Sequence, residues 1–416
     1  MNTPFENVKA LCERAKSSAA VLANSSEKKN VALVALAERL IQNTDKILAA
    51  NVIDIENARA SGITNAMIDR LTLTSARIEA ISKSVMKVVN LPDPTGRGSV
   101  KTLPNGLKVT KISVPLGVIG IIYEARPNVT VDAAALCLKA GNAVVLRGGK
   151  EAVNSNLALG EVIRSALSEA GLPEDCVNVI SDTSRDSSSA LMRMNGLVDV
   201  LIPRGGAGLI KSVVENATVP VIETGAGNCH IYVEKTADFE MAANILFNAK
   251  TSRPSVCNAA EKLLVDRCIA KEFLPIAKAR LDEKNVEIRG GKDVAEILPG
   301  ITPATDEDYF TEYNDYILTV KIVDSTEQAV AHINRHNTGH SEAIITKSMS
   351  AAEYFKAHVD AAAVYVNAST RFTDGEEFGL GAEIGISTQK LHARGPMGLE
   401  ALTSIKYLID GNGQVR

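Results

Sequence analysis

The residues best suited to covalent chemistry lie in residues 251–260, where Cys257 follows Arg253 and Pro254. Apolar residues at helical spacing run through 238–250, and a proline disfavours helical conformation in the residue before it. We therefore expect Cys257 on or beside a turn, at best in the first turn of a new short helix. A helix N-terminus and a nearby arginine would both lower the pKa of the thiol and favour the thiolate. The alternative is a buried, inert cysteine.

Three glycine-rich loops follow successive apolar runs that are typical of buried strands. They are residues 147–150 (Arg-Gly-Gly-Lys), residues 203–208 (beginning Pro-Arg-Gly-Gly) and residues 223–227 (beginning with Glu223). Ligands of open α/β sheets bind outside the carboxyl ends of the strands. Glycine lets backbone N–H groups approach a phosphate, and arginine adds a bidentate cation. The loops therefore predict a ligand that carries phosphate, although no Gly-x-Gly-x-x-Gly fingerprint follows the first strand.

The elements that must position these residues are a helical region and two α/β cycles. Apolar residues recur at helical spacing through residues 5–90. Beyond residue 118, unbroken apolar runs alternate with helices, which indicates a doubly wound parallel sheet covered on both faces. We expect strands of the first cycle at 118–123, 143–146, 176–180, 198–202 and 219–223. We expect strands of the second cycle at 262–265, 316–323, 343–346 and 363–367.

A predicted hairpin separates the helical region from the first core strand. Residues 100–103 and 107–114 flank Pro104-Asn105-Gly106, and Asn-Gly is a strong hairpin-turn signal. The hairpin has too few apolar residues to be stable alone, so we expect it to pair with another strand. The strand expected at 403–409 also looks like an edge element that needs a partner.

Composition excludes several classes of function. The chain has 416 residues, 45% of them hydrophobic and 23% charged, with a net charge of −4, which is typical of a soluble globular protein of two or three domains. We expect no nucleic-acid partner, because there is no basic excess, and no membrane partner, because no apolar run reaches about 18 residues. The N-terminus lacks the pattern of a signal peptide, and six scattered cysteines favour reduced thiols in a cytoplasm.

Metal binding is not predicted either. No Cys-x-x-Cys spacing occurs, and His332, His336 and His340 are the only histidines that recur at helical spacing. Asn337-Thr338-Gly339 resembles a helix end, which would place His340 beyond the helix. We therefore interpret the three histidines as solvated or capping residues.

The motifs together resemble the aldehyde dehydrogenase superfamily along nearly the whole chain. Residues 115–120 with 140–146 are similar to its first core strand, helix and second strand, and the spacing of Glu223 and Cys257 is similar to that of its general base and nucleophile. Within the superfamily, residues 122–128, 147–151, 252–258 and 392–398 resemble the gamma-glutamyl phosphate reductase (glutamate-5-semialdehyde dehydrogenase) branch. The resemblance implies an aldehyde dehydrogenase-like α/β fold with a doubly wound Rossmann-like cofactor domain, a second α/β catalytic domain and a small oligomerisation β-element.

The resemblance also implies an activity. This is the NADPH-dependent reduction of gamma-glutamyl phosphate to glutamate-5-semialdehyde with release of phosphate, the second step of proline biosynthesis from glutamate. Cys257 would attack the acyl carbon to form a thioacyl enzyme, a role that suits a thiolate nucleophile and leaving group. Glu223 would either help to deprotonate Cys257 or position a loop. Asn128 would replace the oxyanion-binding Asn of the family's Trp-Asn pair, which is missing here.

Further roles are carried over motif by motif. Arg126 would hold phosphate or the alpha-carboxylate, or else form a structural ion pair. The other substrate-binding residues implied are Arg253, His392 and Arg394. The cofactor-binding residues implied are Arg147, Gly148, Gly149, Lys150, Arg204, Gly205, Gly206 and Glu312. Relatives commonly read Lys-Pro-Ser-Glu where Arg147-Gly148-Gly149-Lys150 stands, and exchange of the terminal acid for lysine favours NADPH over NADH.

The resemblance sets out domains and partners as well. Residues 1–99 and 115–225 would form the NADP-binding domain, 226–390 the catalytic domain, and 100–114 with 391–416 the oligomerisation element of a dimer or tetramer. Functional coupling to glutamate kinase is a further expectation. A hydrolytic NAD(P)-dependent aldehyde dehydrogenase is the alternative enzyme, disfavoured by the missing Trp-Asn pair. A non-catalytic α/β binding protein and a cysteine hydrolase are the remaining alternatives.

Overall fold

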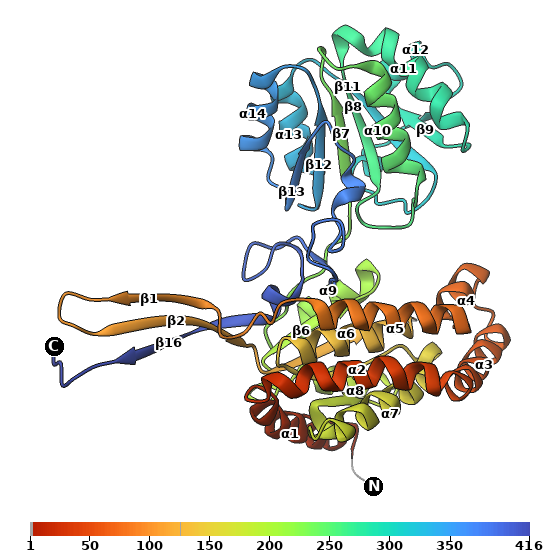
Figure 1. The fold of residues 1–416 in the computed structure, drawn as a ribbon. Coiled ribbons are helices and arrows are strands. Elements are labelled where there is room, and N and C mark those ends of the chain that lie inside the picture. The colour runs from red at the N-terminus through yellow and green to blue at the C-terminus, as the bar shows by residue number, and fades with distance from the viewer. Residues whose placement is uncertain (1–2, 125) are drawn as a thin grey trace. The chain divides into compact units, whose positions relative to one another are not determined.

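The computed structural model describes residues 3–124 and 126–416, so that Ala125 of the 122–128 motif lies outside the described residues (Figure 1). The chain forms two compact units. Unit 1 comprises the chain up to Glu223 together with Gly379–Gly385 and Met397–Arg416. Unit 2 comprises Thr224–Phe378 and Ile386–Pro396. None of the described helices is long and apolar enough to cross a membrane.

Unit 1 begins with the helices that the apolar spacing predicts. They are α1 (Pro4–Leu22), α2 (Ser26–Gln42), α3 (Thr44–Ala60), α4 (Asn65–Leu71) and α5 (Ser75–Asn90). The start of α1 is fixed by a capping box, in which Thr3 Oγ1 accepts from Glu6 N and Glu6 Oε2 accepts from Thr3 N. The buried side of α1 is apolar and small, with Val8, Cys12 and Ala15 nearly inaccessible.

The sheet of unit 1 is a four-stranded parallel sheet in the order β5-β4-β3-β6. Its strands are β3 (Val118–Tyr123), β4 (Ala143–Arg147), β5 (Val177–Val179) and β6 (Val200–Arg204). The helices between and after them are α6 (Asn128–Lys139), α7 (Val153–Glu169), α8 (Arg185–Leu191) and α9 (Ala207–Asn216), with 3-10 turns at Lys150–Ala152 and Glu174–Cys176. Because β4 and β6 flank β3 on opposite sides, the strand order reverses at β3, which is where open α/β sheets bind ligands.

One strand predicted for this sheet is absent. Residues 219–223 form only an isolated bridge, Leu201 to Val221, instead of a strand. Pro220 can accept a hydrogen bond from Leu201 N but has no N–H to donate, so the ladder stops after one step.

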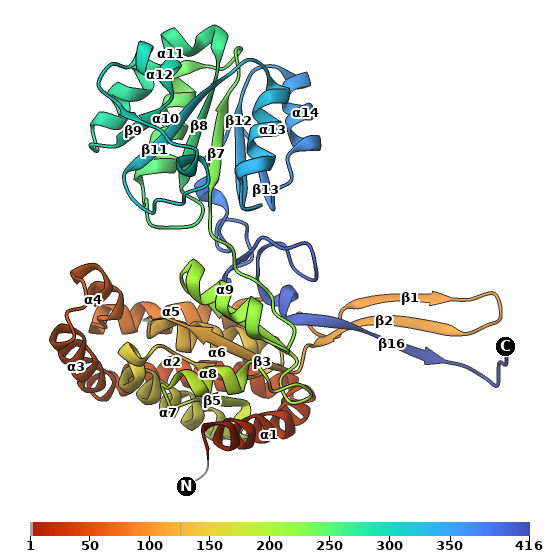
Figure 2. The same cartoon turned by 180° about the vertical axis from the view of Figure 1, so that it is seen from behind.

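A three-stranded antiparallel sheet forms an arm of unit 1 (Figure 2). It consists of β1 (Gly98–Thr102), β2 (Lys108–Pro115) and β16 (Thr403–Asp410), with β2 in the centre. The predicted hairpin and its pairing with another strand are confirmed, and Gly106 adopts the positive φ of 86° that the turn requires. Both edges of the arm carry exposed apolar side chains, among them Val100, Ile405 and Ile409.

Unit 2 contains a seven-stranded parallel sheet in the order β10-β9-β11-β8-β7-β12-β13. Its strands are β7 (Cys229–Val233), β8 (Ala260–Asp266), β9 (Glu287–Gly290), β10 (Thr302–Pro303), β11 (Ile317–Val323), β12 (Ser341–Ile345) and β13 (Ala363–Val366). Its helices are α10 (Phe239–Thr251), α11 (Arg267–Asp282), α12 (Lys292–Ile297), α13 (Thr326–His336) and α14 (Met349–His358). Short elements are 3-10 turns at Glu307–Tyr309, Thr370–Phe372 and, in unit 1, Leu399–Leu402, and a strand pair, β14 (Ile386–Ser387) with β15 (Gly395–Pro396).

The two faces of this sheet pack against different helices, as predicted for a doubly wound sheet. Ile231 and Val233 of β7 belong to the core beneath α10, α11 and α12, whereas Tyr232, between them, packs with Phe355 and other residues beneath α13 and α14 (Figure 1). This alternation follows from the two-residue period of a strand.

Candidate active site

Cys257 lies in the loop that joins α10 to β8, in a turn closed by Ala259 N donating to Val256 O at 3.0 Å. The expected turn is confirmed, but no helix starts there. The thiol therefore follows the C-terminus of α10, the negative end of a helix dipole, so the helix dipole gives no help to a thiolate. Any lowering of the pKa of the Cys257 thiol must come from other groups.

Cys257 differs from most of the other cysteines in its access to solvent. Cys12, Cys137, Cys176 and Cys229 are buried, whereas Cys257 is half-buried and Cys268 is exposed. Burial raises the pKa of Cys12 and of Cys176 to about 12 and raises that of Cys229 well above its usual range. The four buried thiols are therefore protonated and inert at neutral pH.

The backbone of Cys257 is fixed by the segment that enters β7. Cys229 Sγ donates to the carbonyl oxygen of Cys257 at 3.2 Å. A Cβ at Gly227 would overlap that carbonyl oxygen and lie 2.7 Å from the Cα of Cys257. Only glycine fits at position 227, because the two backbones approach each other too closely for a side chain.

Glu312 is joined to the same backbone. Its Oε1 accepts from Gly227 N at 2.7 Å. Glu312, which was predicted to bind the cofactor, is thus linked to Cys257 through Gly227, and all three residues belong to unit 2.

Buried charges hold the loop that carries Glu312. Lys262 Nζ donates to Thr311 O at 2.7 Å, and Glu261 Oε1 accepts from Asn314 N at 3.1 Å. Glu261 also pairs with Lys250 at 2.7 Å, and both side chains are at most 1% exposed. Burial lowers the pKa of Lys262 to about 7 and raises that of Glu261 to about 7, although Lys250 opposes the shift of Glu261.

The interpretation of the three histidines as solvated or capping residues is wrong for His332 and His340. His336, the last residue of α13, does act as a cap, since its Nδ1 lies 2.7 Å from His332 O in the final turn. His332 and His340 are buried, and His336 is half-buried with its ring stacked on His332 at 4.0 Å. Burial lowers the pKa of His340 to about 4 and that of His332 to about 2, so both are neutral at pH 7. A neutral imidazole packs well against aromatic rings such as Tyr309, which the helical spacing alone does not reveal.

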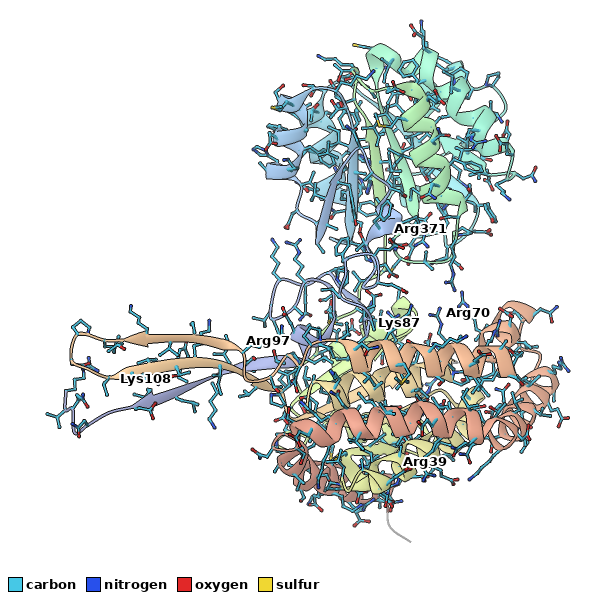
Figure 3. The ribbon with its side chains drawn as sticks, in the orientation of Figure 1. Arg39, Arg70, Lys87, Arg97, Lys108 and Arg371 are labelled. Atoms are coloured by element: carbon cyan, nitrogen blue, oxygen red, sulfur yellow. The ribbon has the colours of Figure 1, made fainter. Side chains whose placement is uncertain are left out.

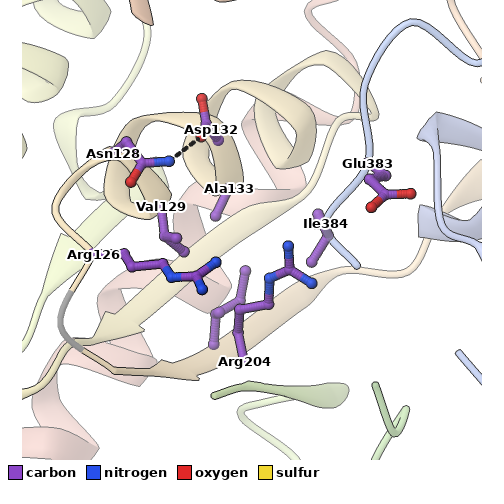
Figure 4. Close-up of a pocket in the computed structure, with 9 residues that line it drawn as sticks. Arg126, Asn128, Val129, Asp132, Ala133, Arg204, Glu383 and Ile384 are labelled. Carbon is purple, nitrogen blue, oxygen red and sulfur yellow. Dashed lines mark hydrogen bonds between the residues drawn. The ribbon is translucent and has the colours of Figure 1, made fainter. Parts of the chain in front are cut away.

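In unit 1, a pocket opens at the carboxyl ends of β3 and β6, where the strand order reverses (Figure 4). Arg126, Asn128 and Arg204 line it, so three predicted site residues lie together. Asn128 Nδ2 donates to Asp132 Oδ2 at 2.9 Å. Burial raises the pKa of Asp132 to about 6, against the effects of Asn128 and Arg204. Asp132 also lines the pocket and was not predicted, since a helical acid gives no sequence signal of its own.

Arg147 has a structural role at the end of β4. Its Nη atoms donate to the carbonyl oxygens of Gly148 at 2.8 Å, Thr183 at 2.6 Å and Ser184 at 2.9 Å. These bonds tie the end of β4 to the start of α8. Lys150 is exposed, so it is the cation of this strand end that is turned to solvent.

The β6–α9 loop suits a phosphate. Gly206, the N-cap of α9, makes no side-chain capping bond, and Arg204 precedes it. Gly206 N donates to Glu124 Oε2 at 2.8 Å, and a Cβ at Gly205 would lie 2.6 Å from the Glu124 carboxyl carbon. The N-terminus of α9 beside Arg204 is thus a place where an anion can bind, and in this structure the Glu124 carboxylate accepts from the Gly206 amide there.

The remaining predicted residues are dispersed. Arg394 Nη2 donates to Asp360 Oδ1 at 2.7 Å, and His392 adopts a positive φ of 68° two residues earlier. Arg253 is exposed in the Cys257 loop, and Glu223 is the last residue of the first segment of unit 1. Sequence reasoning missed Gly227 and Arg371, which both contact the Cys257 loop. Arg371 follows the predicted strand at 363–367, and a cation just beyond a strand end is the signal that would have found it.

Comparison with known proteins shows the family to which the chain belongs. The sequence model of the aldehyde dehydrogenase family matches residues 3–317 and 311–408. The chain is 58% identical to the gamma-glutamyl phosphate reductase of Clostridium botulinum over 97% of this chain and 98% of that protein. It is 60% identical to that of Clostridium perfringens over 94% of this chain and 95% of that protein. The crystal structure of gamma-glutamyl phosphate reductase from Thermotoga maritima superposes with a TM-score of 0.97 at 47% identity, over 98% of this chain and 99% of that one.

Proposed function

Because the chain belongs to the gamma-glutamyl phosphate reductase branch of the aldehyde dehydrogenase family, we propose that it reduces gamma-glutamyl phosphate to glutamate-5-semialdehyde and releases phosphate. The observation that carries the proposal is the loop of Cys257, a half-buried thiol whose backbone is fixed by Gly227 and Cys229. Fixing the backbone of the loop orients the nucleophile for attack on a bound substrate.

The covalent steps follow from the chemistry of a thiolate. Cys257 Sγ attacks the acyl carbon, and the carbon–oxygen bond to phosphate breaks, so phosphate leaves with the bonding electrons and a thioester remains. A reduced nicotinamide, when bound, would supply the hydride that takes the Cys257 thioester to the aldehyde level. Collapse of the resulting thiohemiacetal expels the Cys257 thiolate and frees the semialdehyde. Backbone N–H groups next to Cys257 are the donors proposed for the oxyanions.

Asn128 is proposed as a second oxyanion donor. An amide nitrogen carries two hydrogens, and one of them is directed to Asp132. The other is available to the substrate. Asn258 is excluded from this role, because its Nδ2 already donates to two backbone carbonyl oxygens, those of Arg371 and Thr373. Glu223 either deprotonates Cys257 or positions the loop that follows it, since a reductase needs no base for water.

Members of this family use a nicotinamide cofactor, and we propose that this chain uses NADPH. Lys150, the uncapped N-terminus of α9 and Arg204 support binding of its phosphates. Glu312 is proposed to hold the nicotinamide ribose, with its second carboxylate oxygen left for a hydroxyl group while the first accepts from Gly227 N.

Substrate recognition is proposed to use cations, because gamma-glutamyl phosphate carries a phosphate and an alpha-carboxylate. Arg126 lines the pocket of unit 1 and suits an anionic group of the substrate. Arg253, His392 and Arg394 complete the proposed set, although Arg394 already pairs with Asp360 and so has less of its guanidinium to offer.

Assembly is proposed to occur through the β1-β2-β16 arm. Exposed apolar residues at both edge strands, with unpaired backbone groups, favour addition of strands from another copy. A dimer or tetramer in the cytoplasm, functionally coupled to glutamate kinase, is the assembly we expect. Light scattering that finds a stable, active monomer at micromolar concentration would rule it out.

The test of the function is phosphate-dependent reduction of NADP+ in the presence of glutamate-5-semialdehyde, the reverse reaction, followed by absorbance of the reduced cofactor. We expect no rate without phosphate. Equal rates with and without phosphate would instead establish the hydrolytic aldehyde dehydrogenase reaction.

A further inference from the structure

The guanidinium group of Arg371, a residue labelled in Figure 3, connects the two ends of the Cys257 loop. Its Nε donates to Ser252 Oγ at 3.1 Å, at the C-terminus of α10, and its Nη1 donates to Asn258 Oδ1, directly after Cys257. Ser252 and Asn258 enclose the turn on which the thiol is carried. One planar cation therefore spans the whole loop.

The segment around Arg371 holds Asn258 from several sides. Asn258 Nδ2 donates to the carbonyl oxygens of Arg371 at 3.2 Å and Thr373 at 2.9 Å, and Thr370 Oγ1 donates to the carbonyl oxygen of Asn258 at 2.7 Å. Asn258 is only 4% exposed. Its polar groups are thus satisfied by residues 370–373, which leaves the position of Arg371 well defined relative to Cys257.

The loop needs a cation for an electrostatic reason. Cys257 follows the negative C-terminal end of α10, where the helix dipole disfavours a thiolate. The basic residue in the last turn, Lys250, is engaged with Glu261 in the core. The guanidinium of Arg371 reaches the end of α10 at Ser252 and therefore opposes the dipole at the place where it acts.

Other titratable groups of unit 2 face the same loop. Cys229 and His340 are neutral there, because burial raises the pKa of Cys229 well above its range and lowers that of His340 to about 4. Glu312 contacts the loop through Gly227 and is an anion. Burial and the nearby Arg253 lower the pKa of Arg371, and Asp374, Cys257 and Glu377 raise it. A thiolate and the Arg371 cation therefore stabilise each other.

We propose that Arg371 is a positioning residue for Cys257, which clamps both ends of the nucleophile loop and supplies the positive charge that favours the thiolate. This inference rests on the proposed function only in its consequence for catalysis. Arg253 is the arginine that the sequence places near the thiol, but it is exposed and bonds neither end of the loop in the described residues. The alkylation profile of Arg253→Gln therefore separates a charge that is merely in the loop from the clamp that Arg371 makes.

The experiment measures alkylation of Cys257 by iodoacetamide against pH in a Cys268→Ser background, where Cys257 is the only cysteine with access to solvent. In Arg371→Gln we expect the midpoint of the alkylation profile to rise by about one pH unit, with a rate about tenfold lower at pH 7. Arg371→Lys should retain most of the charge effect but lose part of the clamp, because ammonium cannot donate in the fork of a guanidinium. Arg253→Gln should shift the midpoint less than half as far.

Steady-state kinetics distinguish an effect of Arg371 through Cys257 from an effect on substrate binding. We expect kcat to fall about tenfold in Arg371→Gln while the KM for semialdehyde changes less than threefold, because Arg371 acts through Cys257. An alkylation profile that is the same in Arg371→Gln as in the parent would overturn the proposal, as would equal shifts in Arg371→Gln and Arg253→Gln. If Arg371→Gln fails to fold, Arg371→His takes its place, because an imidazole is neutral at pH 8 and above. An unshifted alkylation midpoint together with an unchanged kcat at pH 8 in Arg371→His overturns the proposal.

Failure of this inference is distinguishable from failure of the proposed function. Cys257→Ser, assayed in parallel, reports on covalent catalysis alone. Activity retained in Cys257→Ser contradicts the mechanism even where the alkylation midpoint moves as expected. An inactive Cys257→Ser with an unmoved midpoint in Arg371→Gln contradicts only the role of Arg371.

Discussion

The sheets of the two units are both parallel and helix-covered, yet their chemical groups gather at opposite ends of the strands. In unit 1 the polar residues follow the strands, with Arg147 at the end of β4 and Arg204 at the end of β6. In unit 2 they precede the strands, with Gly227 before β7, Cys257 before β8 and Glu312 before β11. The candidate site residues of the first sheet thus lie at the carboxyl ends, where open α/β sheets bind ligands, whereas those of the second sheet lie at the amino ends.

The interiors differ as well. Strands β3, β4 and β6 of unit 1 are apolar up to their last residues, whereas β7, β8 and β12 begin with buried polar residues, namely His230, Glu261, Lys262 and Glu342. His230 Nδ1 contacts Glu342 Oε2 at 3.0 Å, and Lys262 supports the loop of Glu312. A sheet whose amino ends carry the site must bury polar groups there, since those ends lie under the loops that the site requires. Strands that are apolar throughout form the core of a sheet. Buried polar side chains at strand ends, in contrast, support the loops that carry the candidate site residues.

The largest effect is expected at the amino ends of unit 2. Cys257→Ser should reduce turnover at least about a thousandfold while cofactor binding is kept, because serine is a far weaker nucleophile at neutral pH. Steady-state rates and fluorescence titration of the cofactor measure the two properties. The control, Cys268→Ser, should remain fully active, and a Cys257→Ser enzyme with a tenth of the parent activity would contradict the assignment.

Gly227→Ala tests the close backbone approach at the same end. A Cβ there collides with the backbone of Cys257, so we expect loss of most activity together with a lower Tm. Gly208→Ala is the matched control, because its φ, like that of Gly227, is not positive and nothing lies within 4 Å of the added carbon. A Gly227→Ala enzyme with parent activity would show that this approach does not constrain the nucleophile.

The buried ion pair of unit 2 should give the next largest effect. Glu261→Gln leaves the Lys250 ammonium buried without its carboxylate, which costs about 3–5 kcal/mol of unfolding free energy in urea. The double variant Lys250→Met, Glu261→Leu should recover most of the stability but not the activity, because Asn314 N loses its acceptor and Glu312 its support. Full activity in the double variant would refute the link between buried charge and site.

Cofactor preference should change less, and it tests the carboxyl ends of unit 1. Lys150→Ala should lower the ratio of kcat/KM for NADPH over NADH by about tenfold to a few hundredfold, the range expected for a charge-assisted contact or two. Arg147→Ala should also lower the Tm, because it removes three bonds to backbone carbonyl oxygens. An unchanged ratio in the Lys150→Ala, Arg147→Ala enzyme would remove the NADPH assignment.

The smallest effect is expected at Asp93 of unit 1. Its carboxylate pairs with Lys29, a buried residue of α2. Burial alone would raise the pKa of Asp93, but hydrogen bonds from Lys29 and Thr95 lower it to about 2. A depressed folded pKa contributes stability above the unfolded value near 4, and this stability is lost as pH falls towards 2. Asp93→Asn should lower the unfolding free energy by up to about 2 kcal/mol at pH 6. It should also remove the contribution of Asp93 to the change of unfolding free energy between pH 4 and pH 2. Parallel pH profiles for the variant and the parent would contradict the pairing.

Local pattern determined the elements and several of the site residues. Runs such as 118–123 and 143–146 are apolar throughout, and such a run can be recognised from neighbouring residues alone. These two runs form β3 and β4. Residues 251–260 alone also allow a buried, inert thiol, and it was the resemblance of the whole motif that singled out Cys257. Arg204 could be named from a strand end and Arg126 from its motif, and they line one pocket.

Tertiary structure decided what those residues contact. Whether Arg147 faces a ligand or three carbonyl oxygens depends on the loop 183–184, and whether His332 is solvated depends on Tyr309 and His230. Folding also brings together residues that local sequence does not pair. Lys250 meets Glu261 in the core, and Arg371 meets Ser252 and Asn258, which lie far from it in the sequence. Periods of 2 and 3.6 residues record which way a side chain points, but hydrogen bonds and burial depend on the partner that the fold brings to it.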